Sequence, residues 1–152
     1  MFKSKVVRTV VALWGRSRRG MTLGVRIAAQ DGEGRVMLVR HGYAPGWHLP
    51  GGGVEVGVTA ETSAVRELEE ETGLIARRLA FAGLYFNPAF GGRDHVALFR
   101  AERFDVGPEP APNREIVERG WFSLEALPEE TTPATRRRLA ELFEEVESNG
   151  RW

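Results

Sequence analysis

A loop rich in glycine and proline, residues 46–57, runs directly into a segment that has the marks of a helix. Glycine and proline at this density exclude regular structure from the loop. Thr59 is a suitable N-cap, Glu61 suits the positive end of a helix dipole, and Gly73 can end a helix in the left-handed conformation. The sequence therefore predicts a helix over residues 60–72 that begins where an irregular loop ends.

Three glutamates on this predicted helix face the same way. Glu67, Glu70 and Glu71 stand at positions i, i+3 and i+4, so their carboxylates project from one side of the helix within a turn. Like charges at this spacing repel one another, and a bound divalent cation such as Mg²⁺ or Mn²⁺ removes the conflict. We therefore expect a metal site that binds a phosphate ester or anhydride. Arg66 is placed to hold a carboxylate and to offset the repulsion.

The spacing of these residues resembles the Nudix box. The matching run is Gly52-x5-Val58-x7-Arg66-Glu67-Leu68-x-Glu70-Glu71-x-Gly73-Leu74. Only Val58 departs from the family pattern, which has glutamate at that position. The segment just before the box is also similar to its counterpart in many Nudix proteins: Trp47-His48-Leu49-Pro50-Gly51-Gly52-Gly53. Together the two motifs cover residues 46–74.

The resemblance implies a hydrolase of phosphoric anhydrides that depends on Mg²⁺ or Mn²⁺. Its metal site would be formed by Glu67, Glu70, Glu71 and Gly52, and the three glutamates would act in catalysis together with Arg66. The substrate it implies is a small nucleotide, in which a nucleoside diphosphate is linked to another group. ADP-ribose, a dinucleoside polyphosphate and a nucleoside triphosphate all fit this description, and the product would be a nucleoside monophosphate or another phosphate-bearing group.

Two points about catalysis stay open in the sequence. Val58 cannot accept a hydrogen bond or polarise a metal-bound water. This leaves a second hypothesis, that the protein is a weakly active or inactive Nudix-fold module with a nucleotide-binding or regulatory role. Nudix proteins also differ in which residue removes the proton from water, so Glu67, Glu115 and Glu118 are all candidates. We include Glu115 among the catalytic residues because a loop before the last strand could bring it to the metals; a solvated loop acid is the alternative.

A nucleotide also needs an aromatic face and cations for its phosphates. The substrate-binding candidates are Arg26, Arg40, Tyr43, Phe86 and Arg93, with Tyr85 and Phe90 as further aromatic residues. The loop over residues 86–93 combines aromatic residues, glycines and an arginine. It is either a lid over the base or sugar, or a packed turn between strands.

The histidines and tryptophans receive no chemical role. His41, His48 and His95 are scattered and do not form a metal trio, so zinc is not expected and they are interpreted as surface or polar-core residues. The four tryptophans are interpreted as packing residues.

The remaining segments predict strands followed by a helix. The predicted strands are Met21–Ala29, Arg35–Arg40, Leu79–Phe86, Asp94–Ala101 and Ile116–Phe122, and the first two are predicted to form a hairpin. A last helix should begin at Thr132-Pro133 and end at Asn149-Gly150. Its core-facing stripe consists of Leu139, Leu142, Phe143 and Val146. The predicted class is α/β, and the resemblance implies a Nudix-type mixed β-sheet sandwiched between α-helices.

Residues 1–19 are predicted to form a basic helical arm, separate from a Nudix domain over residues 20–152. The arm carries six Lys or Arg residues and no Asp or Glu, a charge of +6. Apolar residues recur in it at helical spacing: Phe2, Val6, Val10 and Leu13. Such a helix could dock on this domain or on a second subunit of a homodimer, or lie on an anionic membrane surface. Docking is favoured because one short helix anchors weakly to a membrane.

The composition narrows the possible functions further. The chain has no cysteine, which excludes disulfides, thiolate nucleophiles and cysteine-based zinc sites and agrees with a cytoplasmic location. Its formal net charge of zero argues against nucleic acid as the partner. No stretch is apolar and long enough for export or membrane insertion. The partner that the resemblance implies is a small nucleotide.

Overall fold

The computed structural model describes residues 10, 14, 15 and 19–152, apart from the side chain of Phe90. Two helices and a short helical turn accompany the strands: α2 (Ala60–Thr72), α3 (Ala89–Gly92) and α4 (Pro133–Phe143). The strands are β1 (Thr22–Ala29), β2 (Arg35–His41), β3 (Trp47–His48), β4 (Leu74–Asn87), β5 (Asp94–Val106) and β6 (Ile116–Ser123). A 3-10 turn, Leu124–Ala126, follows β6.

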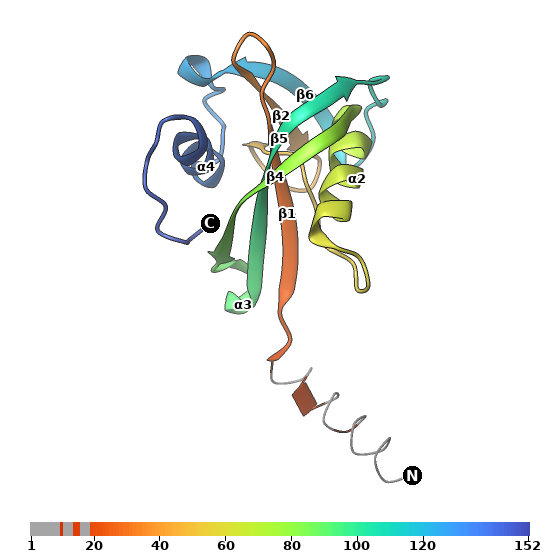
Figure 1. Cartoon of the computed structure of the whole chain (residues 1–152), viewed down its shortest axis with the longest axis vertical. Coiled ribbons are helices and arrows are strands. Elements are labelled where there is room, and N and C mark those ends of the chain that lie inside the picture. The colour runs from red at the N-terminus through yellow and green to blue at the C-terminus, as the bar shows by residue number, and fades with distance from the viewer. Residues whose placement is uncertain (1–9, 11–13, 16–18) are drawn as a thin grey trace.

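These strands form two three-stranded sheets between the two longer helices. One sheet has the order β1-β5-β4, with β1 parallel and β4 antiparallel to β5, and the other has the order β3-β2-β6. Figure 1 shows α2 and α4 on opposite sides of the strands. The predicted α/β class, with a mixed sheet between helices, is confirmed.

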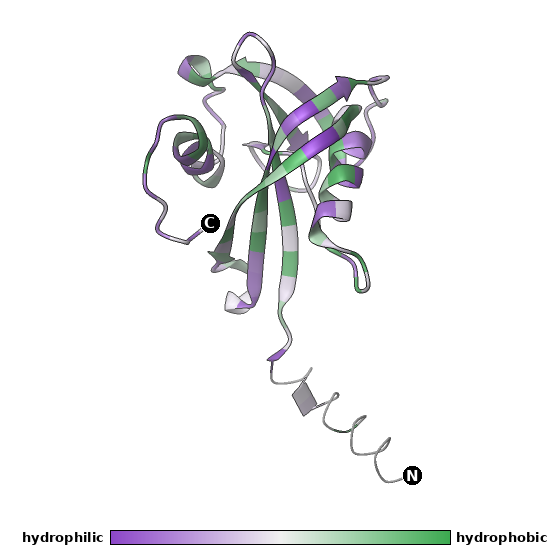
Figure 2. Ribbon diagram, in the orientation of Figure 1, coloured by the Kyte–Doolittle hydropathy of each residue, from purple (hydrophilic) through white to green (hydrophobic). Residues whose placement is uncertain are grey.

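The first sheet buries both of its faces, one against each helix. Val25 and Ile27 of β1 lie in a core cluster with Leu68 of α2, while Leu98 of β5 lies in a second cluster with Leu139 of α4. Alternate residues along a strand point to opposite faces, so one strand can contribute side chains to both clusters. Figure 2 shows hydrophobic residues along the strands, interrupted by hydrophilic ones.

The hairpin predicted for the first two strands is wrong. β1 pairs with β5 and β2 pairs with β6, so the two strands belong to different sheets, and the antiparallel bridge beside the turn that connects them is an isolated one, between Gln30 and Val36. The other edge of β1 is taken by the glycine-rich loop: the backbone N–H of Val25 donates to the Gly52 carbonyl at 2.8 Å, and that of Ile27 to the Pro50 carbonyl at 2.9 Å. Pairing with this loop leaves β1 no free edge for a hairpin partner.

The two long helices agree with prediction to different degrees. α2 has the predicted bounds, and both predicted caps are present: the Thr59 side chain accepts a hydrogen bond from the Thr62 N–H, and Gly73 is left-handed with φ 75°. α4 begins as predicted after Thr132 but ends at Phe143, well before the predicted end at residues 149–150. The chain leaves the helix through Glu145, which has a φ of 56°.

The early end of α4 removes Val146 from the core. Its side chain is 52% exposed, so its assignment to the buried stripe is wrong. The segment after the helix instead returns to β4, where the Phe86 N–H donates to the Gly150 carbonyl at 2.9 Å. This contact joins residues that are far apart in the sequence, and no local sequence signal indicates it.

The predicted arm helix, residues 1–19, falls mostly outside the described residues. Of its apolar stripe only Val10 is described, and its side chain is exposed. Within the described part of the chain, none of the helices has both the length and the apolar character that a membrane span requires.

Candidate active site

The glycine-rich loop brings β1 and α2 together. Gly51 has a φ of 148°, and a Cβ at this residue would lie 2.0 Å from the Val25 carbonyl oxygen, so only glycine can pass the strand edge here. At Gly52 a Cβ would lie 2.8 Å from the carboxylate of Glu67. The two glycines therefore let the loop pack between the strand and the acidic face of the helix.

Glu71 is the most buried carboxylate of the predicted trio, with 4% of its surface exposed. Its Oε2 accepts a hydrogen bond from the Gly51 N–H at 2.9 Å, whereas its buried Oε1 has no hydrogen-bond partner. Burial raises the pKa of Glu71 to about 8, and the nearby carboxylates of Glu67 and Glu115 also raise it, against the lowering effect of the Gly51 hydrogen bond and of Arg26. At neutral pH and without a cation, this carboxyl group is mainly protonated.

Glu67 is partly buried, and Glu70 is exposed. Burial raises the pKa of Glu67, and the charge of Glu70 raises it further. The guanidinium of Arg66 lies 3.8 Å from the Glu67 carboxylate, which opposes this shift. The trio thus spans a range of exposure, from buried Glu71 to solvated Glu70.

An acidic pocket of about 520 Å³ brings these residues together with the loop before β6. Its lining comprises Glu55, Arg66, Glu67, Glu70, Glu71, Asn113, Glu115 and Ile116. The predicted catalytic residues Arg66, Glu67, Glu70, Glu71 and Glu115 therefore all line one pocket. Glu118, the other candidate base, does not line it, and its carboxylate lies 3.4 Å from Arg40.

Glu55 lines the same pocket, although the sequence analysis gave it no role. Its carboxylate lies 3.6 Å from the Arg66 guanidinium. The turn that places it is closed by a hydrogen bond from the Val58 N–H to the Glu55 carbonyl at 3.2 Å. The sequence could have indicated Glu55, because it is a carboxylate three residues before Val58 and a single turn brings these two positions close together.

The donor set of this pocket fits a hard divalent cation. The buried Glu71 Oε1 lacks a partner, and the neighbouring candidate ligands are carboxylate oxygens, which Mg²⁺ and Mn²⁺ prefer. Among the described residues, no three His, Asp or Glu side chains already stand together as a ready-made coordination site. The carbonyl of Gly52, a predicted metal ligand, accepts a hydrogen bond from the Val25 N–H at 2.8 Å.

A second pocket, of about 440 Å³, is lined in part by Gly52 and Gly53 of the glycine-rich loop. Its lining comprises Thr22, Leu23, Gly24, Arg26, Tyr43, Gly52, Gly53, Asn87, Asp94, Val96 and Trp152. We call it the β1 pocket, because four of these residues come from that strand. Two predicted substrate-binding residues, Arg26 and Tyr43, are among them.

Arg26 connects the β1 pocket to the loop. Its Nη1 donates to the carbonyls of Leu49 and Gly51, each at 3.0 Å, and lies 3.4 Å from the Nε2 of His41. The His41 ring stacks on Tyr43 with 4.9 Å between centroids, and its Nδ1 lies 3.9 Å from Glu71 Oε1. Burial lowers the pKa of His41 to about 4, with Arg26 adding to the effect, so this histidine is neutral near pH 7 and makes no ion pair with Glu71.

The other substrate candidates lie outside both pockets. Arg40 is within 3.5 Å of Glu118 and Glu130, Phe86 packs against His95 and Arg151, and the Arg93 side chain donates to the Gly20 carbonyl. Tyr85 is buried beneath α4, where its hydroxyl donates to Glu141 at 2.8 Å. The predicted lid loop holds the short helix α3, and the Phe90 side chain is outside the described part.

Arg119 of β6 is a further residue that the sequence did not indicate. Its side chain is nearly buried, and its Nε donates to the Glu71 carbonyl at 2.8 Å. Another nitrogen of the same guanidinium donates to the Pro110 carbonyl. Arg119 thus fixes the last turn of α2 to the chain before β6, but a single arginine on a strand gives no sequence signal of that contact.

Known proteins are similar to this chain in sequence and in fold. The chain matches the NUDIX domain over residues 20–143. It is 34% identical to a putative 8-oxo-dGTP diphosphatase of Bacillus subtilis, over 78% of this chain and 77% of that protein. It is 33% identical to an ADP-ribose pyrophosphatase of Methanocaldococcus jannaschii, over 63% of this chain.

The likeness to solved structures is equally clear. The crystal structure of a MutT NUDIX hydrolase from Burkholderia pseudomallei superposes with a TM-score of 0.69, at 29% identity, over 80% of this chain and 97% of that one. The chain spans 59% of the length of the M. jannaschii protein and 42% of the length of a mycobacterial relative, a putative mutator protein MutT4 to which it is 37% identical. The domain match, the common fold and the box residues lead to one conclusion: the chain belongs to the Nudix hydrolase family.

Proposed function

We propose that this protein is a divalent-metal-dependent hydrolase of small nucleotides that cleaves a phosphoric anhydride bond. The substrate would be a nucleoside diphosphate linked to another group, such as ADP-ribose, a dinucleoside polyphosphate or a nucleoside triphosphate. The observation that carries the proposal is the buried Glu71 oxygen without a partner, in a pocket lined by three further glutamates of the predicted site. Burying such an oxygen is costly unless it is protonated or paired with a cation.

Glu67, Glu70 and Glu71 would hold the cation, with the Gly52 carbonyl as a further donor. When bound, Mg²⁺ or Mn²⁺ would neutralise the anhydride oxygens and lower the pKa of the attacking water. Arg66 would keep the Glu67 carboxylate oriented toward the pocket, because its guanidinium lies 3.8 Å away.

Glu115 is our candidate for the residue that removes a proton from the attacking water. It lines the acidic pocket, whereas Glu118 does not, and Glu67 is already assigned to the cation. The Asn113 side chain accepts hydrogen bonds from the N–H groups of Glu115 and Ile116, which fixes the backbone that carries Glu115. A carboxylate held in this way can take the proton without a rearrangement of its loop.

The nucleoside would enter the β1 pocket, which meets the acidic face of α2 at Gly52. A volume of about 440 Å³ falls in the usual range for small-ligand sites. Tyr43 offers an exposed aromatic ring, and Arg26 adds a positive charge beside the loop. The B. subtilis relative is a putative 8-oxo-dGTP diphosphatase and the M. jannaschii relative is an ADP-ribose pyrophosphatase, which supports the same substrate class.

The test is hydrolysis of a nucleotide panel with Mg²⁺ or Mn²⁺. We expect release of a nucleoside monophosphate or phosphate, with a loss of at least about 100-fold in Glu70→Gln and Glu71→Gln. Glu69→Gln is the matched control, because Glu69 lies on the same helix, is exposed and does not line the pocket. No hydrolysis, together with a nucleotide-induced rise in melting temperature, would favour the binding module that Val58 leaves open.

A further inference from the structure

The segment 149–152 lies beside the end of β4, far from its neighbours in sequence. The Phe86 N–H donates to the Gly150 carbonyl, and the Trp152 N–H donates to the Phe86 carbonyl, each at 2.9 Å. These two bonds form a short parallel bridge between Phe86 and Arg151. Figure 1 shows the segment coming from α4 back to the strands.

Two arginines of α4 hold this segment in place. The side chain of Arg138 is fully buried and donates to the Arg151 carbonyl and, at 2.6 Å, to Glu141. Arg137 donates to the Trp152 carbonyl at 2.8 Å. A buried guanidinium is costly without hydrogen-bond partners. Because Arg138 finds one of its partners in segment 149–152, we infer that this segment has a fixed position.

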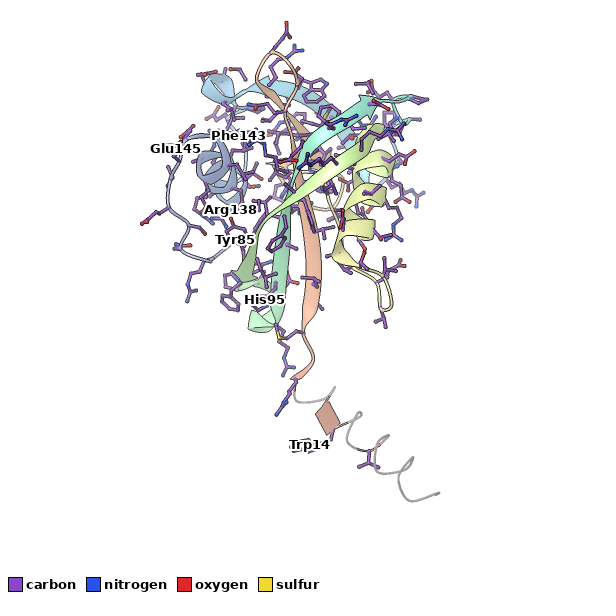
Figure 3. All side chains as sticks on the ribbon, viewed as in Figure 1. Trp14, Tyr85, His95, Arg138, Phe143 and Glu145 are labelled. Atoms are coloured by element: carbon purple, nitrogen blue, oxygen red, sulfur yellow. The ribbon has the colours of Figure 1, made fainter. Side chains whose placement is uncertain are left out.

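Arg138 also lies between two aromatic rings. Its guanidinium carbon is 4.1 Å from the centroid of Tyr85 and 5.4 Å from that of Trp152, and these two rings meet edge to face at 5.8 Å. Figure 3 shows Arg138 of α4 next to Tyr85 of β4. The Trp152 ring thus contacts Arg138 and Tyr85 and packs against the second core cluster, yet it remains partly exposed and lines the β1 pocket.

Hydrogen-bonded polar side chains line the β1 pocket together with Trp152. Asp94 is buried, and it accepts hydrogen bonds from the Thr22 hydroxyl at 2.7 Å and from the Asn87 amide at 2.8 Å. A flat heterocycle against Trp152 would therefore meet an aromatic surface beside polar groups that are already held in place. This combination suits a nucleobase better than a phosphate or a bare sugar, since bases stack on aromatic rings.

We propose that Trp152 is a substrate-binding residue that packs against the nucleobase and favours purines, whose two rings offer the larger stacking surface. The inference rests on the proposed function in one respect, that the substrate is a nucleotide. Segment 149–152 would then help to determine which base the β1 pocket accepts. From the sequence, all four tryptophans were interpreted as packing residues.

The test compares GMP, CMP and ribose 5-phosphate as calorimetric probes of binding. For Trp152→Ala we expect GMP affinity to fall by roughly 5- to 100-fold, CMP affinity to fall less, and ribose 5-phosphate affinity to stay within about twofold. Trp152→Phe should retain most of the GMP affinity. Val146→Ala, an exposed position between α4 and the segment, is the control and should leave all three affinities unchanged.

A fluorescence measurement tests direct contact, even if the alanine variant folds poorly. GMP should quench tryptophan emission of the wild type, and the quenching should largely disappear in Trp152→Phe while calorimetric binding persists. Equal losses for GMP and ribose 5-phosphate, unchanged GMP affinity in Trp152→Ala, or no GMP binding by the wild type would each overturn the assignment. Failure of the proposed hydrolase has a different signature, since GMP would then bind as described while no panel nucleotide is cleaved.

Discussion

The Glu55 carboxylate lies 3.6 Å from the Arg66 guanidinium, three residues before the position where Val58 interrupts the Nudix box. Glu55 is 70% exposed, so this ion pair adds little to folding stability. The ion pair instead helps to position the Arg66 side chain, which also lies 3.8 Å from Glu67. Glu55 therefore places a negative charge beside Arg66 in a chain that lacks the glutamate expected at position 58.

Moving the negative charge from position 55 to position 58 should change kcat/KM in a predictable way. We expect Glu55→Gln to lower kcat/KM by about 10-fold, the lower end of the usual range for a group that orients a metal-site residue. Adding Val58→Glu should restore most of the loss, whereas Val58→Glu alone should have a smaller effect. The measurement is a double-mutant cycle on kcat/KM with Mg²⁺ and the best substrate of the panel. Purely additive effects would contradict the exchange.

Gly52 and Gly53 offer a matched pair for testing the packing of Glu67. A Cβ at Gly52 would lie 2.8 Å from the Glu67 carboxylate, whereas one at Gly53 would have no heavy atom within 4 Å. We expect Gly52→Ala to displace the carboxylate and lower kcat by about 10- to 100-fold, comparable to loss of a supporting contact at a metal site. The Mg²⁺-induced rise in melting temperature should be reduced in Gly52→Ala and retained in Gly53→Ala. Equal behaviour of the two variants would count against the contact.

The raised pKa of Glu71 predicts a dependence of stability on pH. Its folded-state pKa of about 8 is above the ordinary 4.5, so the folded protein keeps a proton that the unfolded chain releases. The associated stability is full below pH 4.5 and is lost as pH rises toward 8. Without divalent cations, Glu71→Gln should therefore gain stability over the wild type as pH rises from 5 to 8, by an amount on the order of a few kcal/mol.

Thermal unfolding in EDTA at several pH values measures this difference. Adding Mg²⁺ at pH 8 should raise the melting temperature of the wild type and leave that of Glu71→Gln nearly unchanged, since the variant lacks the buried charge that the cation pairs with. A difference between the two proteins that does not vary with pH would show that Glu71 is not the buried acid described here.

His41 predicts a dependence of the opposite sign. Its folded-state pKa of about 4 is below the ordinary 6.5, so between these values the unfolded chain takes up a proton that the folded protein refuses. Its contribution is lost as pH falls from 6.5 toward 4. Between pH 7 and pH 5, the wild type should lose about 1 to 2 kcal/mol more than His41→Gln in urea unfolding. Parallel losses would mean that His41 takes up its proton in the folded state as well.

Features of the fold that depend on residues close together in the sequence could be predicted, and those that depend on distant residues could not. The bounds and caps of α2 depend on side chains within one turn of each end, such as Thr59 and Gly73, and they were predicted correctly. The hairpin was wrong because the choice of a partner for β1 depends on the loop at Gly52, which is distant in sequence and takes the strand edge. Strand residues alone do not indicate which edge is already occupied.

The residues of the candidate site also fall into those that the sequence could predict and those that it could not. The acidic residues of α2 were placed by helical periodicity, and Glu115 also lines their pocket. Of the substrate candidates, Arg26 and Tyr43 line the β1 pocket, whereas Arg40 points toward Glu118 and Glu130. Residue type cannot separate these cases, because the face of a strand that meets a pocket is decided by the packing of the sheets.

The most direct measurement of the central claim is anomalous diffraction from crystals soaked in Mn²⁺. The account predicts a peak in the acidic pocket within about 2.0 to 2.6 Å of carboxylate oxygens of Glu67 and Glu71, with Glu70 turned toward it. The same soak of Glu71→Gln should give a weak peak or none. A pocket without a peak in the wild type, in crystals that bind Mn²⁺ elsewhere, would contradict the claim that these glutamates form the metal site of a nucleotide hydrolase.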